Sequence, residues 1–176
     1  KRPKTRPYKT KNYYALLVQQ ADAKMEVNRI FKMEKSKSGS PAQEYLNCGN
    51  DTSTQFFAAS VAEELLLNTE LTEESKDRAI HLLKEFGLYE YRDAHPSTLS
   101  GGQKQRLAIA CAVFSGRRIL ILDESTSGLD GQIMRLIAER LKSEVRRGRT
   151  ILVITHDREL IESCCDNIVE VDKRSS

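Results

Sequence analysis

The sequence lacks tryptophan and has only four prolines and four cysteines in 176 residues. The longest apolar run, residues 107–114, is far too short to cross a bilayer. No C-x-x-C pair occurs, and Cys164 and Cys165 are adjacent, which argues against a zinc ribbon and a disulfide framework. Without a recognisable signal peptide, we expect a cytosolic chain with reduced thiols that meets a membrane only through a partner.

Glycine is also scarce where a phosphate loop would need it. The pattern G-x-x-x-x-G-K-[ST] holds nucleotide phosphates with its backbone N–H groups and its lysine. This sequence has nine glycines, the first is Gly39, and no Gly-Lys pair occurs. KTRPYKT (4–10) offers lysine and threonine, but proline and tyrosine cannot replace glycines that wrap a phosphate. These observations exclude a standard phosphate loop.

Charge is unevenly distributed along the chain. Residues 1–50 carry eleven Lys and Arg against four Asp and Glu, a net charge of +7. Residues 51–176 carry seventeen against twenty-one, a net charge of −4. The basic head is compatible with nucleic acid or anionic lipid as a partner, but a charge run is more often a solvated arm.

From residue 61 onward, helical and strand patterns alternate. Residues 61–67 predict a short helix, and three further helical patterns end at glycines, in 72–87, 100–116 and 133–148, with a shorter helix near 160–164. Apolar runs that predict buried strands cover 119–122 and 150–154, and an alternating strand follows at 167–171. Strands separated by helices predict an α/β fold with a parallel sheet.

Polar residues come directly after two of the predicted strands. Asp123 and Glu124 come after the first buried run, and His156 comes after the second. Ligands of parallel sheets bind beyond the carboxyl ends of the strands, so these three side chains are candidates for one site. An Asp there can hold Mg²⁺, the Glu can polarise a water molecule, and the His can contact a transferring phosphoryl group.

The stretch STLSGGQKQRLAIA (97–110) predicts an anion site at the start of a helix. A helix N-terminus carries unpaired N–H groups and a partial positive charge. Ser100 can donate its hydroxyl, and Gly101 and Gly102 leave room for a phosphate to approach the backbone.

Four motifs together resemble the ATP-binding-cassette (ABC) ATPases. LSGGQ (99–103) resembles their signature, ILILDE (119–124) their Walker B strand, SGLD (127–130) their D-loop, and THD (155–157) carries the switch histidine. The order and spacing are those of the family, over about residues 50–171. The resemblance implies a P-loop NTPase-like parallel sheet, the C-terminal half of an ABC ATPase domain, with a helical signature subdomain.

The resemblance also implies roles for single residues, with ATP and Mg²⁺ as cofactors. Asp123 would bind Mg²⁺, Glu124 would be the general base, and His156 would sense the γ-phosphate. Ser100, Gly101, Gly102 and Gln103 would clamp the ATP held by an opposite subunit, and Asp130 would communicate across the dimer.

One segment indicates a subtype. STQFFAASVAEELL (53–66) resembles the segment after the Q-loop in the cobalt and energy-coupling-factor importers, which couple ATP to uptake of vitamins or metal ions. Spacing places Asn50 where that family has the Q-loop glutamine, a side chain longer by one methylene. Ser125 stands where the family usually has proline.

The sequence pattern predicts the secondary structure of the first fifty residues least clearly. Segments 13–18 and 25–31 are compatible with strand or helix, and 32–44 predicts a loop. Residues 15–28 resemble the segment after the phosphate loop in the family, so the head is either an eroded or truncated nucleotide-binding half or an unrelated leader. The predicted division is a degenerate or truncated N-terminal nucleotide-binding part (1–49), a Q-loop region with the helical signature subdomain (50–116), and a Walker B, D-loop and H-loop α/β part (117–176).

The expected function is that of an ATP-binding and ATP-hydrolysing subunit of an energy-coupling-factor-like importer. It would lie peripherally on the cytoplasmic face of the plasma membrane, with a second ABC ATPase subunit and a transmembrane coupling subunit as partners. Whether the chain alone is an active ATPase stays open, because the phosphate loop is missing.

Two alternatives remain. The chain can be a non-catalytic partner that donates LSGGQ to another subunit's ATP site. It can also be a soluble ABC-type ATPase acting on nucleic acid, which the basic head favours. Nucleic acid is the weaker expectation, since only about fifty residues separate Asn50 from the signature, too few for the long coiled coil of repair ATPases.

Overall fold

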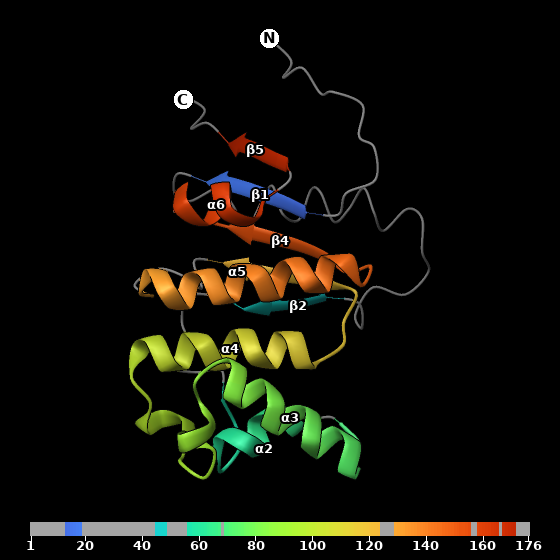
Figure 1. The fold of residues 1–176 in the computed structure, drawn as a ribbon, viewed down its shortest axis with the longest axis vertical. Helices are drawn as coiled ribbons and strands as arrows, with labels where there is room; N and C mark the ends of the chain where they lie inside the picture. Colours follow the sequence, from blue (N-terminus) through green and yellow to red (C-terminus); the bar gives the residue numbers. More distant parts are fainter. Residues whose placement is uncertain are drawn as a thin grey trace.

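The computed structural model of this chain describes residues 13–18, 45–48, 56–67, 69–123, 129–155, 158–165 and 167–171. Within these ranges the chain forms a parallel sheet with helices on one face and a stack of helices beyond one edge (Figure 1). No helix of the described ranges is both long enough and apolar enough to cross a membrane.

The sheet has five strands in the described part of the chain. They are β1 (Tyr13–Val18), β2 (Tyr45–Cys48), β3 (Ile119–Asp123), β4 (Thr150–Ile154) and β5 (Asn167–Val171). Their order is β2-β3-β4-β1-β5, and every pair is parallel. The predicted parallel sheet is therefore confirmed, and β1, for which the sequence left strand and helix open, is an inner strand.

Strands β3 and β4 form the centre of the core. Leu120 and Ile151 are paired in register and fully buried, as the apolar runs 119–122 and 150–154 predict. No sequence pattern indicated β2, because YLNC is short and neither alternating nor wholly apolar. Its strand conformation comes from pairing with β3, for example Leu46 with Leu120.

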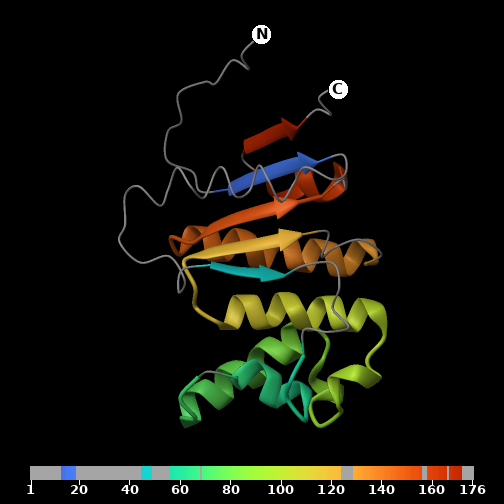
Figure 2. The same ribbon diagram turned by 180° about the vertical axis from the view of Figure 1, so that it is seen from behind.

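The helices lie in two groups. They are α2 (Val61–Leu66), α3 (Glu73–Glu85), α4 (Gly101–Phe114), α5 (Gly131–Arg146) and α6 (Arg158–Cys164), with 3-10 turns η2 (Tyr89–Tyr91) and η3 (Pro96–Thr98) before α4. Helices α5 and α6 cover one face of the sheet, and Figure 2 shows the strands from the other side. Helix α4 lies between β2 and the pair α2 and α3.

Helix α3 begins and ends as its sequence predicts. Thr72 is its N-cap, and the Thr72 hydroxyl accepts from the Ser75 amide at 3.1 Å while the Ser75 hydroxyl accepts from the Thr72 amide at 3.0 Å. Gly87 lies just after the helix with a φ of 63°, a conformation that other residues seldom adopt.

Helix α4 is more deeply buried than the predicted apolar stripe. From residue 107 to its end it is buried on nearly all sides, with Ala108, Ile109, Ala112 and Val113 added to the expected contacts. The reason is its position between β2 and the α2–α3 pair, since a helix covered from two sides needs apolar residues all round.

Candidate functional site

The parallel strands β1, β3 and β4 all end on the same side of the sheet, which we call the sheet edge below. Asp123, the last residue of β3, is in register with Ile154, the last residue of β4, and its side chain is half-buried. Leu16 of β1 is also in register with Ile154. The chain therefore leaves all three inner strands on the same side, which is the side on which ligands of parallel sheets bind.

The signature residues form the N-terminus of α4. Ser100 is the N-cap, and its hydroxyl accepts a long bond from the Gln103 amide at 3.4 Å. The Gln103 side-chain oxygen accepts from the Ser100 amide at 2.8 Å, which completes a capping box. Ser100 and Gly101 are exposed, and Gly102 and Gln103 are half-exposed, so this helix end faces outward.

The fold itself has no need for glycine at the two signature positions. Both glycines have helical backbone, and a Cβ atom on Gly101 would meet nothing within 4 Å. A Cβ atom on Gly102 would lie 3.7 Å from Leu129, an ordinary contact. Glycine is a poorer helix former than alanine, so these residues are better explained by a group that approaches from outside.

The start of α5 lies beside the start of α4. Leu129 is the residue that faces Gly102, and it directly precedes Asp130. Asp130 is exposed and is the N-cap of α5, and its Oδ1 accepts from the Ile133 amide at 2.9 Å. The signature and the end of the SGLD motif thus form one surface, at the end of the molecule toward which the strands point (Figure 1).

Three of the predicted site residues lie outside the described residues. They are Asn50, Glu124 and His156. The remaining candidates fall into two groups: Asp123 at the sheet edge, and Ser100, Gly101, Gly102, Gln103 and Asp130 on the paired helix N-termini.

Sequence reasoning missed the turn that leads into the signature. Pro96 is buried and begins η3, and the His95 ring nitrogen Nδ1 lies 2.7 Å from the Ser97 hydroxyl. The Thr98 hydroxyl donates to the His95 carbonyl at 2.7 Å. Proline at a first helical position was the available signal for this turn.

A second missed feature holds the turn at residues 56–58. Glu64 in α2 is buried, and its Oε2 accepts from the amides of Phe57 at 2.9 Å and Ala58 at 2.8 Å. This carboxylate fixes the turn that carries Phe57, whose side chain is 83% exposed.

The family model named ABC transporter matches residues 16–127. This is more than half of the chain, so the chain belongs to the ABC transporter family. The match begins within β1 and ends before Asp130 and His156. It includes residues 16–49, where the sequence alone left two interpretations open.

The chain is also similar to curated proteins of that family. It is 45% identical over 120 residues to the methionine import ATP-binding protein MetN of Haemophilus influenzae, which covers 65% of this chain and 34% of the relative. It is 42% identical over 123 residues to MetN of Escherichia coli, covering 69% of this chain and 36% of the relative. The chain therefore spans about a third of the length of these relatives.

Solved structures confirm the fold. An ATP-binding subunit of an ABC transporter aligns with a TM-score of 0.74 and 22% identity, covering 92% of this chain and 75% of the other. CbiO1 of Clostridium perfringens, part of the ABC transporter complex cbiONQ, aligns with a TM-score of 0.66 and 24% identity, covering 91% and 73%. The predicted ABC ATPase fold is confirmed.

Proposed function

We propose that this chain is the ATPase subunit of an ABC importer and that the N-terminus of α4 contacts the terminal phosphates of an ATP molecule held by a second ATPase subunit. The observation that carries the proposal is the exposed N-terminus of α4, where two glycines stand that the fold does not require. Membership of the ABC transporter family and the similarity to import ATP-binding proteins support it.

The physical basis is anion binding at a helix end. The first amides of α4 and the helix dipole favour a negative group in front of residues 100–103. A serine hydroxyl that accepts one bond can still donate another, so Ser100 can bind a phosphate oxygen while its cap persists. Substituents as small as hydrogen at Gly101 and Gly102 let that phosphate reach the backbone.

The sheet edge supplies the second half of the proposed chemistry. Asp123 would hold Mg²⁺, because that ion usually takes one or two carboxylates together with substrate phosphates. Glu124 would polarise the attacking water and His156 would sense the γ-phosphate. When bound, Mg²⁺ neutralises charge that develops on the phosphates.

The segment after β1 is the proposed remnant of the phosphate loop. β1 is an inner strand of the sheet, and a phosphate loop comes directly after such a strand in the sequence of P-loop proteins. The eight residues VQQADAKM (18–25) match the motif in length and keep its lysine as Lys24. Ala23 and Met25 replace the second glycine and the hydroxyl residue. This supports the eroded nucleotide-binding half rather than the unrelated leader.

The partner on the membrane side would be a transmembrane coupling subunit. The turn that carries the exposed Phe57 belongs to the segment that resembles the energy-coupling-factor group, and Glu64 fixes it. We propose that this turn contacts the coupling subunit, which places the chain on the cytoplasmic face of the plasma membrane. Uptake of a vitamin or metal ion is the proposed specificity of that subtype.

Equilibrium binding of labelled Mg-ATP tests the proposal. Without phosphate-loop glycines, the isolated chain loses several charge-assisted contacts of roughly 1.5–3 kcal/mol each, so we expect weak binding. Mixing with an ABC ATPase subunit that has an intact phosphate loop should tighten binding, and Ser100→Arg in this chain should cancel that gain. Micromolar affinity of the isolated chain would contradict the eroded loop, and an unchanged affinity in the Ser100→Arg mixture would contradict the signature contact.

The altered loop also favours a second candidate, in which the chain only completes its partner's site. Glu124→Gln in this chain distinguishes the two. A subunit that hydrolyses ATP at its own site loses that share of the turnover in Glu124→Gln. A non-catalytic partner shows unchanged turnover in Glu124→Gln and loses turnover only in Ser100→Arg.

A further inference from the structure

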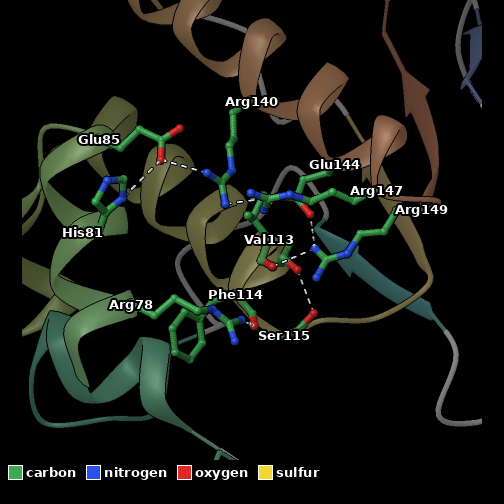
Figure 3. A network of polar contacts seen from close by, with 11 residues as sticks. Arg78, His81, Glu85, Val113, Phe114, Ser115, Arg140, Glu144, Arg147 and Arg149 are labelled. Atoms are coloured by element: carbon green, nitrogen blue, oxygen red, sulfur yellow. Dashed lines mark hydrogen bonds and ion pairs between the residues drawn. The ribbon is translucent and has the colours of Figure 1, made fainter. Parts of the chain in front are cut away.

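A buried carboxylate lies at the far end of α5, opposite the candidate site. Glu144 is 1% exposed, and its Oε1 lies 3.0 Å from Arg140 and 2.9 Å from Arg147 (Figure 3). Its Oε2 lies 2.9 Å from Arg149, which comes after α5 and precedes β4. Burial lowers the pKa of Arg149, and Glu144 opposes that shift by stabilising the charged guanidinium. One carboxylate therefore holds three arginines.

Two arginines also bind the last carbonyls of α4. The Arg149 Nη1 that pairs with Glu144 donates to the Val113 carbonyl at 2.8 Å. Arg78 of α3 donates to the Phe114 carbonyl, and its guanidinium lies 4.2 Å from the centroid of the Phe114 ring. Positive side chains at a helix C-terminus satisfy carbonyls without intrahelical partners and complement the dipole.

Arg140 links the same carboxylate to α3. Arg140, bound to Glu144, also lies 3.1 Å from Glu85 at the end of α3 (Figure 3). His81 Nδ1 is 3.9 Å from the same Glu85 oxygen. Helices α3, α4 and α5 are thus joined at this end by one chain of ion pairs and hydrogen bonds.

Residues that flank α5 lie against both ends of α4. Both helices run in the same direction (Figure 1). Gly102 lies near Leu129, which precedes α5, and the Val113 carbonyl accepts a hydrogen bond from Arg149, which follows α5. The start carries the signature, and a Cβ atom placed on Gly102 would lie at ordinary contact distance from the Leu129 side chain. The end carries charge-assisted hydrogen bonds.

We infer that Glu144 is a positioning residue for the signature. Through Arg149 it fixes the last turn of α4, and through Arg140 it fixes the end of α3, so the direction of α4 and the place of residues 100–103 depend on this carboxylate. The expected effect on ATP hydrolysis rests on the proposed function. The dependence of the place of residues 100–103 on Glu144 does not.

The length of α4 turns a small tilt into a large displacement. Fourteen residues span about 21 Å, so a tilt of about 5° at the anchored end moves the signature by about 2 Å. A displacement of about 1 Å can cost a reacting site roughly 100-fold in rate. We call Arg140, Arg147 and Arg149, which all pair with Glu144, the arginine cluster. A small shift of this cluster is therefore sufficient to move residues 100–103 away from a bound phosphate.

Nuclear magnetic resonance of the full chain tests the position directly. Glu144→Gln keeps the shape of the side chain and removes its charge, and Arg149→Met removes the guanidinium that joins Glu144 to the Val113 carbonyl. In both variants we expect loss of the nuclear Overhauser effect between Gly102 and the Leu129 methyl groups, and shifted amide resonances for Gly101 and Gly102. The amide resonances of the first turn of α3 should stay in place, because its capping box is local.

Glu139→Gln is the matched control. Glu139 lies on the same helix, is exposed, and pairs with Lys142 at 2.9 Å. Its substitution should leave the Gly102–Leu129 contact intact. A contact that persists with unchanged glycine resonances in Glu144→Gln overturns the inference, and Arg149→Met decides the question if Glu144→Gln does not fold.

Turnover separates this inference from the proposed function. In a complex with an intact ATPase subunit, Glu144→Gln should lower ATP hydrolysis roughly tenfold or more while Glu139→Gln leaves it unchanged. A lost Gly102–Leu129 contact with unchanged hydrolysis would support the positioning role and contradict the proposed function. An unchanged contact would overturn the positioning role whatever the hydrolysis rate.

Discussion

The two ends of α4 differ in what holds them. Its start is exposed and is capped by its own residues, with Ser100 and Gln103 bonded to each other's amides. Its end is buried, and arginines from α3 and from the turn before β4 bind its last carbonyls. The cap at the start is thus formed by residues of α4 and its N-cap alone, and it is open to a ligand. The carbonyls at the end are bound by residues far away in the sequence. This difference is suited to a helix that is anchored at one end and presents its other end to a partner.

The strongest test of the anchored end is Glu144→Ala. Removal of one member of a buried ion pair leaves the other charges uncompensated, which typically costs about 3–5 kcal/mol. We expect a loss of that size in the free energy of unfolding, measured by urea denaturation. A loss below about 1 kcal/mol would show that the arginine cluster does not hold the helices together.

A pair of glycine substitutions compares the two ends more finely. Gly148, after α5 at the anchored side, has a φ of 91°, so Gly148→Ala forces a side chain into a left-handed conformation at a cost of about 1–2 kcal/mol. Gly101 has helical backbone and open space around it, so Gly101→Ala should be neutral or stabilising by up to about 1 kcal/mol. Thermal unfolding of both variants measures the contrast. Equal destabilisation would mean that the fold requires glycine in the signature.

The Ser100 cap at the start of α4 should contribute less to the free energy of unfolding than Glu144 does. Ser100→Ala removes the hydroxyl that accepts from the Gln103 amide, and because that bond is long we expect a loss of about 0.5–1 kcal/mol. Chemical denaturation provides the value. A loss as large as that of Glu144→Ala would place Ser100 in the structural anchor rather than in an open site.

Glu139→Gln should have the smallest effect. The hydrogen bond from Lys142 and its charge lower the pKa of Glu139, so the pair stabilises the fold above the ordinary carboxyl pKa and loses that contribution as the pH falls. Because Glu139 is exposed, solvent screens the pair, and we expect the wild-type and variant unfolding midpoints to coincide at neutral pH. A clear difference would show that exposed charges on α5 also contribute to the anchor.

Features determined by neighbouring residues were predictable from the sequence. The Thr72 cap, the glycine after α3, the strands β3 and β4 and the signature helix arise from local patterns, and the structure confirms them. Strand β2 and the burial of Glu144 were not predictable, because both depend on contacts with distant segments. The domain boundaries near residues 49 and 116 stay a prediction.

Some features of the candidate site were also predictable from local sequence, and others were not. The start of a helix at residues 100–103 was predictable, since a helix cap is local in sequence, whereas the roles of these residues and of Asp130 stay predictions. Their proximity through Gly102 and Leu129 was not predictable, since it depends on how α4 packs beside α5. Glu124, His156 and Asn50 keep their predicted roles as hypotheses.

The most direct test of the proposed nucleotide contact is ATP hydrolysis by this chain mixed with an ABC ATPase subunit that has an intact phosphate loop. The comparison is between wild type and Ser100→Arg, which fills the open end of α4 with a long cationic side chain while the buried end stays intact. We predict that Ser100→Arg abolishes the hydrolysis that mixing stimulates, with an unfolding midpoint within a few degrees of wild type. Full stimulation by Ser100→Arg would contradict the claim that this helix end contacts the nucleotide.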